Sequence, residues 1–223
     1  RSSDLNGRGR GIFVQTHHAI ALIMALSLQS AFATTVTVNS SSALSSAISS
    51  ASGGDTIRVR SGSYGALTIT GRTFTTPLTI MAYPGEERQA VFSAGSYGSG
   101  KSLSIRDCRN IRVINLTFRN ALWVVMIENS HYITVEGCKI HDAGQEGVVV
   151  RYLDGEKRGG SSHVTIKGCE IFDTGKRGPD YVIYGEGVYI GDGRSGGEND
   201  TTNNVTVIDC DIHHTSAEAV DLK

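Results

Sequence analysis

A nine-residue phrase occurs four times along this chain and alternates between apolar and polar residues. Its copies span residues 110–118, 132–140, 163–171 and 204–212. The sixth residue of each copy is small (Asn, Gly or Asp), and Leu or Cys follows it directly. Alternation with a period of two predicts a strand with one buried face, and the small residue indicates a bend between two short strands. The phrase therefore predicts a pair of short strands that recurs along the chain.

The spacing of the copies predicts how these strand pairs stack. The first aliphatic residues, Ile111, Ile133, Val164 and Val205, are separated by 22, 31 and 41 residues. A phrase repeated every ~20–50 residues is typical of a solenoid, and 22 residues is about one turn of a parallel β-helix. The longer intervals correspond to one coil plus insertions of about 9 and about 19 residues, which a solenoid accommodates as side loops. We therefore expect an all-β, right-handed parallel β-helix of about five or six coils.

The first third of the predicted domain contains a helical pattern. Over residues 41–52, four apolar residues (Leu44, Ala47, Ile48 and Ala51) share one face, with Ser before them and a pair of glycines after them. Such a helix would cover the apolar end of the solenoid, which needs a cap.

Residues 1–33 have the three-part pattern of an export signal. Arg8 and Arg10 precede an apolar run at 19–28, and Ala-Phe-Ala at 31–33 supplies the small residues that a signal peptidase recognises. The run is too short to span a bilayer. We expect a signal peptide and a secreted, extracellular protein, with a buried helix as the alternative.

Charge and chain ends set further expectations. The chain has 21 basic and 22 acidic residues, so its charge gives no indication of nucleic-acid binding. We also expect no membrane association and a monomer. The chain stops at Lys223 inside a repeat. We therefore expect the β-helix domain, residues 34–223, to be truncated at its C-terminal end.

Three of the four cysteines occupy the same position of successive copies. Cys138, Cys169 and Cys210 should stack inside the coil, about 4.8 Å apart, as buried free thiols. The alternative for an exported chain is disulfide bonding. Cys108 occupies a different position, equivalent to Ser130.

Three glutamates follow the cysteine position at a constant offset. Glu146 and Glu218 lie eight residues after it, and Glu186 lies eight residues plus a nine-residue insertion after it. The equivalent residue one coil earlier would be Val124. Two carboxylates about 4.8 Å apart repel by roughly 3 kcal/mol at an effective dielectric near 20. Such a row must hold raised pKa values, hydrogen-bond to backbone or share a cation.

A hard cation such as Ca²⁺ prefers oxygen ligands and would satisfy this row. Asp221 and Asp192 are close enough in sequence to add oxygens. We take Glu146, Glu186, Glu218 and Asp221 as candidate metal ligands. The alternative is that each glutamate only accepts hydrogen bonds from the adjacent turn and shapes the corner of the coil.

Lys223 follows Glu218 by five residues, as Arg151 follows Glu146. A bend between Glu218 and Val220 would place Lys223 on the same outer surface as the carboxylates. A lysine beside acids usually forms a solvated ion pair with an ordinary pKa. Beside a bound divalent cation its pKa can fall, and it can then act as a base.

These patterns resemble right-handed β-helix polysaccharide lyases of the alginate lyase and chondroitinase B family. The similar segments are 43–64, 77–82 and 111–118, which many β-helix proteins share. The family also uses a Glu-x-aliphatic-x-aliphatic-Lys phrase, and Glu218 to Lys223 resembles it. The resemblance implies that Glu218 ligates Ca²⁺ and that Lys223 is the catalytic base.

Three departures from the family pattern stand out. Ser216 stands where the family has a second acid, and Glu186 falls near a ligand that is Asn in the family. The family's catalytic arginine comes from the following coil, which this chain lacks.

The resemblance implies a secreted lyase that cleaves an acidic, uronate-containing polysaccharide by Ca²⁺-assisted β-elimination. Candidate substrate-binding residues are Arg151, Tyr184, Tyr189 and His213: the tyrosines would stack on sugar rings, and histidine carries protons near neutral pH. Two other functions stay open. One is a glycoside hydrolase that uses a carboxylate pair from among Asp173, Asp211 and Glu218. The other is a carbohydrate-binding or cell-wall β-helix without catalysis.

Overall fold

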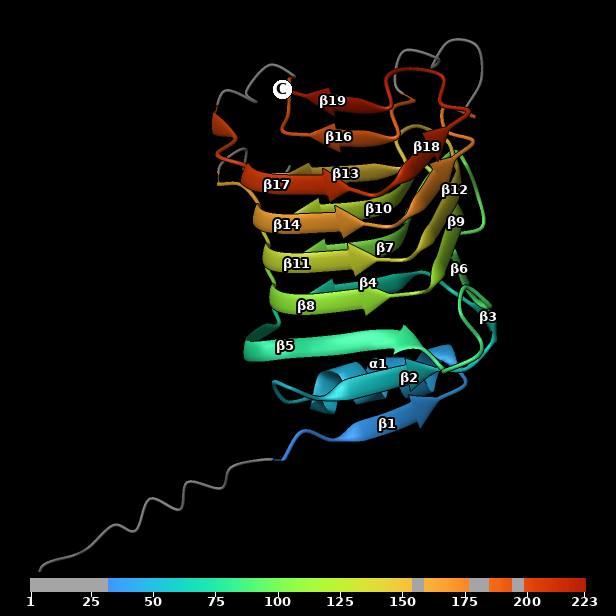
Figure 1. Ribbon diagram of the computed structural model, residues 1–223, viewed down its shortest axis with the longest axis vertical. Helices are drawn as coiled ribbons and strands as arrows, with labels where there is room; N and C mark the ends of the chain where they lie inside the picture. Colours follow the sequence, from blue (N-terminus) through green and yellow to red (C-terminus); the bar gives the residue numbers. More distant parts are fainter. Residues whose placement is uncertain (1–31, 154–158, 177–184, 194–198) are drawn as a thin grey trace, which may run out of the picture. The chain divides into compact units, whose positions relative to one another are not determined.

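The structure is a computed structural model that describes residues 32–153, 159–176, 185–193 and 199–223. These residues wind into a solenoid of short parallel strands, which stack into three sheets along its axis (Figure 1). Each complete coil contributes one strand to each sheet, and there are six such coils. The predicted all-β, right-handed parallel β-helix is confirmed. Apart from its last two residues, the expected signal peptide lies outside the described residues.

The sheets are numbered in the order in which the chain visits them. In spatial order, sheet 1 consists of β1 (Thr35–Val38), β2 (Thr56–Val59), β5 (Thr73–Ala82), β8 (Arg109–Ile114), β11 (His131–Glu136), β14 (Ser162–Lys167) and β17 (Asn203–Ile208). Sheet 2 consists of β3 (Gly62–Tyr64), β6 (Ala90–Ser93), β9 (Thr117–Ala121), β12 (Lys139–Ala143), β15 (Glu170–Phe172) and β18 (Asp211–His213). Sheet 3 consists of β4 (Leu67–Thr70), β7 (Lys101–Arg106), β10 (Trp123–Glu128), β13 (Val148–Arg151), β16 (Val188–Ile190) and β19 (Val220–Leu222).

The register of sheet 1 follows the repeated phrase. Ile111, Ile133, Val164 and Val205 are successive partners across β8, β11, β14 and β17. Each pairs with its counterpart although up to 41 residues separate them. The extra residues of the longer coils fall between strands and leave the ladders uninterrupted.

The small residue of the phrase forms the bend between sheets 1 and 2. Asn115, Gly137, Gly168 and Asp209 all have positive φ, between 54° and 64°. This left-handed conformation favours Gly, Asn and Asp because larger side chains clash with the backbone there. The sequence therefore specifies the bend in every copy.

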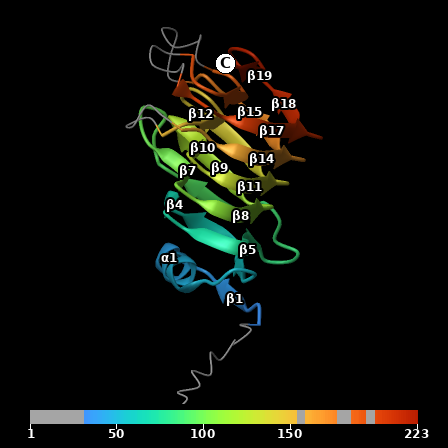
Figure 2. The same cartoon turned by 90° about the vertical axis from the view of Figure 1, so that its left-hand side faces the viewer.

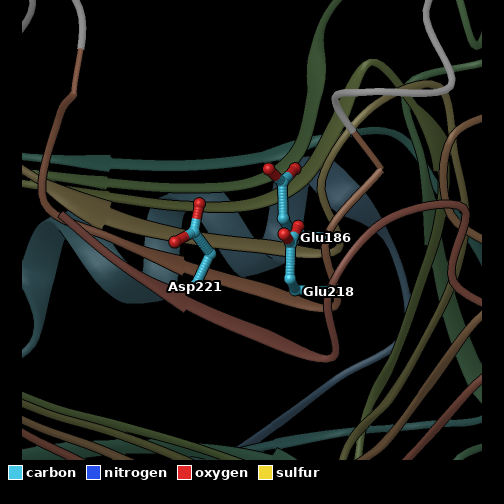
Figure 3. A group of neighbouring side chains, drawn as sticks. All are labelled: Glu186, Glu218 and Asp221. Carbon is cyan, nitrogen blue, oxygen red and sulfur yellow. The ribbon is translucent and has the colours of Figure 1, made fainter.

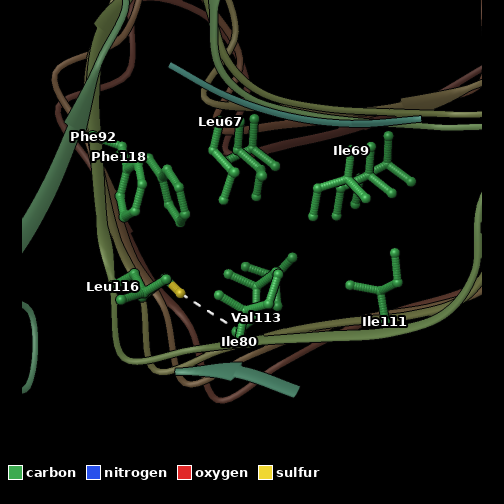
Figure 4. Close-up of a cluster of buried hydrophobic side chains, with 14 of the residues drawn as sticks. Leu67, Ile69, Ile80, Phe92, Ile111, Val113, Leu116 and Phe118 are labelled. Atoms are coloured by element: carbon green, nitrogen blue, oxygen red, sulfur yellow. Dashed lines mark hydrogen bonds between the residues drawn. The ribbon is translucent and has the colours of Figure 1, made fainter. Parts of the chain in front are cut away.

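Side chains in equivalent positions stack along the axis to form the core. The rings of Tyr64, Phe92 and Phe118 stack with centroids 4.9 and 5.2 Å apart. Figure 4 shows the rings of Phe92 and Phe118, with Leu67 and Ile69 in aliphatic stacks beside them. Burying each such side chain contributes about 1.5–3 kcal/mol. The core therefore extends as one column through the coils.

The cysteines form the predicted column of free thiols. Cys138 and Cys169 are buried, whereas Cys210, in the last coil, is partly exposed. Cys108 belongs to a different bend, where its backbone N–H donates to the hydroxyl of Ser130 at 3.1 Å. The equivalence of these two residues is confirmed, and none of the four cysteines forms a disulfide.

Helix α1 (Ser41–Ser50) covers the N-terminal end of the solenoid (Figures 1 and 2). The hydroxyl of Ser40 accepts the N–H of Ala43 at 3.2 Å and caps the helix. Leu44 and Ile48 enter the core, as the pattern predicted. At ten residues α1 is too short to cross a membrane, and no other described helix has the length and hydrophobicity to do so.

The last coil has inward apolar residues that nothing in the described chain covers. Val220 and Leu222 are in register with the buried Val188 and Ile190, yet they are 44% and 75% exposed. Their register places Asp221 and Lys223 on the outer face, as expected from alternation.

Candidate active site

The three glutamates form one column at the start of the sheet 3 strands. The N–H of Gly147 donates to the carbonyl of Glu186, and the N–H of Gly187 donates to that of Glu218, both at 3.0 Å. Glu146, Glu186 and Glu218 are therefore equivalent, as the constant offset predicted.

The position one coil earlier is Trp123, and the assignment of Val124 to it was wrong. The N–H of Val124 donates to the carbonyl of Glu146, so Val124 is the counterpart of Gly147. Val124 belongs to the core, because the chain bends here and turns two consecutive residues inward. The Trp123 side chain instead lies near the carboxylate of Glu146 and lowers its pKa, against the larger effect of burial.

Glycine follows two of the glutamates because the bend has no room for a side chain. A Cβ on Gly187 would lie 2.6 Å from the carbonyl oxygen of Ala219, and one on Gly147 would lie 2.8 Å from that of Gly187. Ala219 is tolerated at the same position of the last coil, where no described coil lies above it. The bend expected between Glu218 and Val220 is therefore present in all three coils.

Three carboxylates meet on the outer face of the last two coils (Figure 3). Glu186, Glu218 and Asp221 each offer an oxygen, and these oxygens lie within 4.8 Å of one another. Glu186 is buried, Asp221 is partly buried and Glu218 is exposed. Asp221 joins the group because it follows Glu218 by three residues and projects from the same face of β19.

Glu186 is the buried end of this group. Burial raises the pKa of its carboxyl above the usual value, and the nearby charges of Asp221 and Glu218 raise it further. Its Oε2 atom is buried, and no residue in the described part of the chain hydrogen-bonds to it. A buried carboxylate oxygen is costly unless a proton or cation satisfies it, so this donor set fits a hard cation such as Ca²⁺.

Glu146 continues the column but lies outside the three-carboxylate group. Burial raises its pKa to about 7, and the charge of Glu186 adds to the effect. Its Oε2 is also buried and, among the described residues, has no hydrogen-bond partner. With a pKa near neutrality and the Trp123 side chain beside it, Glu146 is suited to hold a proton rather than to share a metal.

Lys223 lies beside the carboxylate group. Its Nζ is 2.6 Å from Oδ2 of Asp221 and 5.8 Å from the ring centroid of Tyr189. The hydrogen bond to Asp221 raises the pKa of Lys223 above its usual value. In this arrangement the amine is therefore held in its charged form.

Arg151 does not lie on the outer surface, so the structure corrects its assignment as a substrate-binding residue. The side chain is buried, with Nη2 3.3 Å from Oε1 of Glu128 and Nη1 3.4 Å from Oδ2 of Asp192. Lys101 also reaches Glu128, at 3.1 Å. Its register position is that of Lys223, outside the core, but its ion pairs with Glu128 and Asp192 hold the side chain in a covered position.

The remaining candidates for sugar binding lie apart. Tyr189 is partly buried in β16, next to Asp221 in register, and its hydroxyl accepts the N–H of Gly193 at 2.9 Å. Tyr184 lies outside the described residues. His213 is on β18 in sheet 2, where it stacks on Phe172 with ring centroids 5.0 Å apart. Of the candidates that the structure describes, Tyr189 alone lies beside Lys223.

Sequence reasoning missed two residues of this region. Trp123 is the chain's single tryptophan and borders the glutamate column, and Glu128 anchors Arg151. A strand register for β10 would have found both, but the phrase that reveals register does not extend to sheet 3.

Comparison with known proteins supports the fold and indicates a class of relatives. The profile of the family described as "Right handed beta helix region" matches residues 10–223. Among solved structures, the chain is similar to an alginate lyase from Paenibacillus sp. str. FPU-7, with 26% identity and a TM-score of 0.66 over 78% of this chain. A search of curated protein sequences finds no significant match.

The match extends over 57% of the alginate lyase, so this chain spans little more than half of that protein. A second solved structure, pectate lyase Pel9A, is 12% identical to this chain, with a TM-score of 0.41. The match covers 71% of this chain and 62% of the pectate lyase. That likeness is too remote to inform the site.

Proposed function

This chain belongs to the right-handed beta helix region family, and from that premise we propose that it is a secreted polysaccharide lyase. Its substrate would be a uronic-acid polysaccharide, and its reaction a calcium-assisted β-elimination. The similarity to an alginate lyase supports the class of reaction. The export-signal pattern of residues 1–33 supports secretion.

The observation that carries this proposal is the position of Lys223 beside three carboxylates. A cationic amine, a group of carboxylate oxygens within 4.8 Å of one another and a tyrosine ring share one face of sheet 3. The carboxylates alone would repel an acidic polymer. Binding of a uronate therefore requires a cation among them, and the unpartnered Oε2 of Glu186 provides a position for one.

Glu186, Glu218 and Asp221 would hold the metal ion. Bound Ca²⁺ would neutralise the uronate carboxylate and thereby make the C5 proton more acidic. Positive charge among the carboxylates would also weaken the hold of Asp221 on the Lys223 ammonium and lower the pKa of Lys223.

Neutral Lys223 would take the C5 proton on Nζ. The electron pair of the C5–H bond forms the C4–C5 double bond, and the bond from C4 to the bridging oxygen breaks. The oxygen leaves with a proton from water. One product then carries an unsaturated uronate at its new end.

A glycoside hydrolase is the second candidate, and one observation favours it. Carboxylates of a retaining hydrolase lie about 5–5.5 Å apart, which is close to the separation within this group. Asp211 and Asp173 do not contribute to such a pair, because Asp211 lies in β18 of sheet 2 and Asp173 pairs with Lys176 at 3.2 Å.

Product chemistry separates the two reactions. Alginate, pectate and chondroitin would be incubated with the protein and Ca²⁺, and ultraviolet absorbance would report unsaturated uronate. Lys223→Ala is expected to abolish the signal and to keep calcium binding. Lys176→Ala is a matched control, since Lys176 also pairs with an aspartate (Asp142, 2.7 Å) but on another sheet. New reducing ends without absorbance would identify a hydrolase instead.

Calcium binding is tested separately from turnover. Glu186→Gln and Glu218→Gln should each weaken calcium affinity, as measured by isothermal titration, and leave the circular dichroism spectrum unchanged. Unchanged calcium affinity in both variants would show that the glutamates only shape the bend of the coil and do not bind the metal. Calcium binding without turnover would favour a carbohydrate-binding β-helix.

A further inference from the structure

A second surface of the solenoid has a built groove that the proposed reaction does not use. It runs along the outer face of sheet 1, across β8, β11, β14 and β17. Arg112, Thr134, Thr165 and Thr206 form its floor, one from each strand, in successive register. The groove therefore follows the solenoid axis across four coils.

The wall of the groove contains one residue with an unusual backbone conformation. Asn110, Tyr132, His163 and Asn204 are the first residues of the four phrases, and all have positive φ, between 52° and 58°. Asparagine is favoured in this conformation, whereas a bulky side chain such as tyrosine is an outlier there. Tyr132 thus keeps a strained backbone, whereas two other coils have Asn at the same position, and such strain points to a function.

The two rings are held firmly, yet they remain accessible. Tyr132 and His163 stack with centroids 4.4 Å apart and an interplanar angle of 8°, and the guanidinium of Arg109 covers the other face of Tyr132 at 4.2 Å. Tyr132 is 41% exposed, and His163 is also exposed. Both faces of the Tyr132 ring are occupied, and Nδ1 of His163 lies 3.2 Å from the hydroxyl of Ser162, so the stack offers the Tyr132 hydroxyl and Nε2 of His163 to the groove.

The floor offers hydroxyl groups at regular intervals. Within the described chain, the hydroxyls of Thr134, Thr165 and Thr206 make no hydrogen bond, and adjacent ones belong to strands about 4.8 Å apart. Free hydroxyls in a row match a linear polymer that presents a polar group on every unit.

The charge around the groove is positive. Arg112 and Lys167 both pair with Glu136, at 3.2 and 3.8 Å, so two cations share one anion. Arg109 on the ring stack adds a third cation. The surface therefore favours an anionic ligand over a neutral one.

We propose that this groove binds a segment of an acidic polysaccharide, extended along the solenoid axis, apart from the Lys223 site. Its carboxylates would meet Arg109 and Arg112, and its hydroxyls would meet the threonines and the edges of Tyr132 and His163. The polymer class rests on the proposed function. The groove would hold a long chain on the protein while sheet 3 acts on another segment of it.

The chain supplies its own test variants. Tyr132→Asn and His163→Asn introduce the residue that the same position carries at Asn110 and Asn204, so the double variant should keep or raise the melting temperature. A second variant, Thr134→Val with Thr165→Val, removes two floor hydroxyls and retains their shape. Tyr83→Asn is the matched control, because Tyr83 also lies beneath an arginine (Arg60, 4.2 Å from the ring centroid) but is not part of the groove.

Affinity electrophoresis measures binding to alginate and polygalacturonate, with dextran as the neutral polymer. Every protein in this assay also carries Lys223→Ala, so that the polymer is not cleaved. The Tyr132/His163 variant should bind acidic polymer at least about tenfold more weakly, as expected for the loss of one to two hydrogen bonds. The threonine variant should also weaken binding, and Tyr83→Asn should not. With Lys223 intact, turnover of long polymer should fall in the first two variants while that of a trisaccharide is unchanged.

Unchanged polymer binding in both groove variants would overturn the proposal, even if the protein is a lyase. Equal binding of dextran would overturn the assignment to an acidic ligand. A third outcome is that the protein cleaves no uronate polymer but binds acidic polymer, and that the groove variants bind it more weakly. This result would support the groove as a binding site and reject the lyase function.

Discussion

Nζ of Lys223 and Oδ2 of Asp221 lie 2.6 Å apart, so the proposed base is paired with a proposed metal ligand. The same carboxylate therefore keeps the amine charged and contributes to the oxygen cluster that would hold Ca²⁺. The two roles compete, because a carboxylate that coordinates a metal ion stabilises the charged form of the neighbouring amine less. Metal binding and activation of the base are thereby coupled through one side chain.

Asp221→Asn tests this coupling. The hydrogen bond to Asp221 is the main cause of the raised pKa of Lys223, so removing the carboxylate should lower that pKa. The same variant should bind Ca²⁺ more weakly, since one of three carboxylates is lost. The ¹³Cε chemical shift of Lys223, followed against pH in EDTA, measures the first effect, and isothermal titration measures the second. An unshifted titration of Lys223 would show that the ion pair does not form in solution.

Glu146 should make the stability of the protein depend on pH. Its pKa is raised from 4.5 to about 7 in the folded chain, so between these values the native state binds more protons than the unfolded state. The free energy of unfolding should therefore be highest below about pH 4.5 with respect to this group and fall as pH rises through 7. The loss is at most about 3 kcal/mol.

Glu146→Gln should remove this contribution, because an amide does not ionise. Urea unfolding in EDTA at pH 5, 7 and 8.5 would compare the two proteins. The variant is expected to gain stability over the parent as pH rises. A parallel pH dependence in both proteins would assign the effect to other groups, such as Glu186.

Gly187→Ala should distort the backbone that positions the carboxylate cluster. The added Cβ would lie 2.6 Å from the carbonyl oxygen of Ala219, and overpacking of this kind costs about 1–3 kcal/mol. Because the strain falls between Glu186 and Glu218, calcium affinity should drop as well. Ala219→Gly, the reverse change at the equivalent exposed position, is the control and should alter stability by about 1 kcal/mol or less. Equal calcium affinity in Gly187→Ala and the parent would separate the bend from the site.

The fold and the glutamate column were predictable because the bends recur in every coil. The small residue before each cysteine fixes where the chain turns, so a constant offset locates Glu146 and Glu218. The rule failed one coil earlier. Ala121 and Ala143 are partners in sheet 2, and Trp123 and Glu146 are equivalent at the start of sheet 3. Trp123 follows Ala121 by two residues, whereas Glu146 follows Ala143 by three. This turn is one residue shorter, and no repeated motif reveals the difference.

Burial of Arg151 was not predictable from local sequence. Its partner Glu128 lies 23 residues before it and Asp192 lies 41 residues after it, and only the stacking of coils brings them together. Alternation correctly placed Arg151 outside the core, but a charged network then covered it. The same limit applies to Asp221, whose three-residue offset from Glu218 gains meaning only when β16 lies beside β19.

Arg151→Met is expected to destabilise the protein, whereas a surface arginine should not. The change leaves Asp192 and Glu128 buried without the guanidinium, and breaking a buried ion pair from one side costs about 3–5 kcal/mol. Arg119→Met is the matched control, because Arg119 is exposed on the outer face of β9 and such changes usually stay within about 0.5 kcal/mol. Urea unfolding of both variants measures the difference. A fully stable Arg151→Met protein with weakened polysaccharide binding would instead return Arg151 to the substrate surface, since only an accessible guanidinium could affect binding without affecting folding.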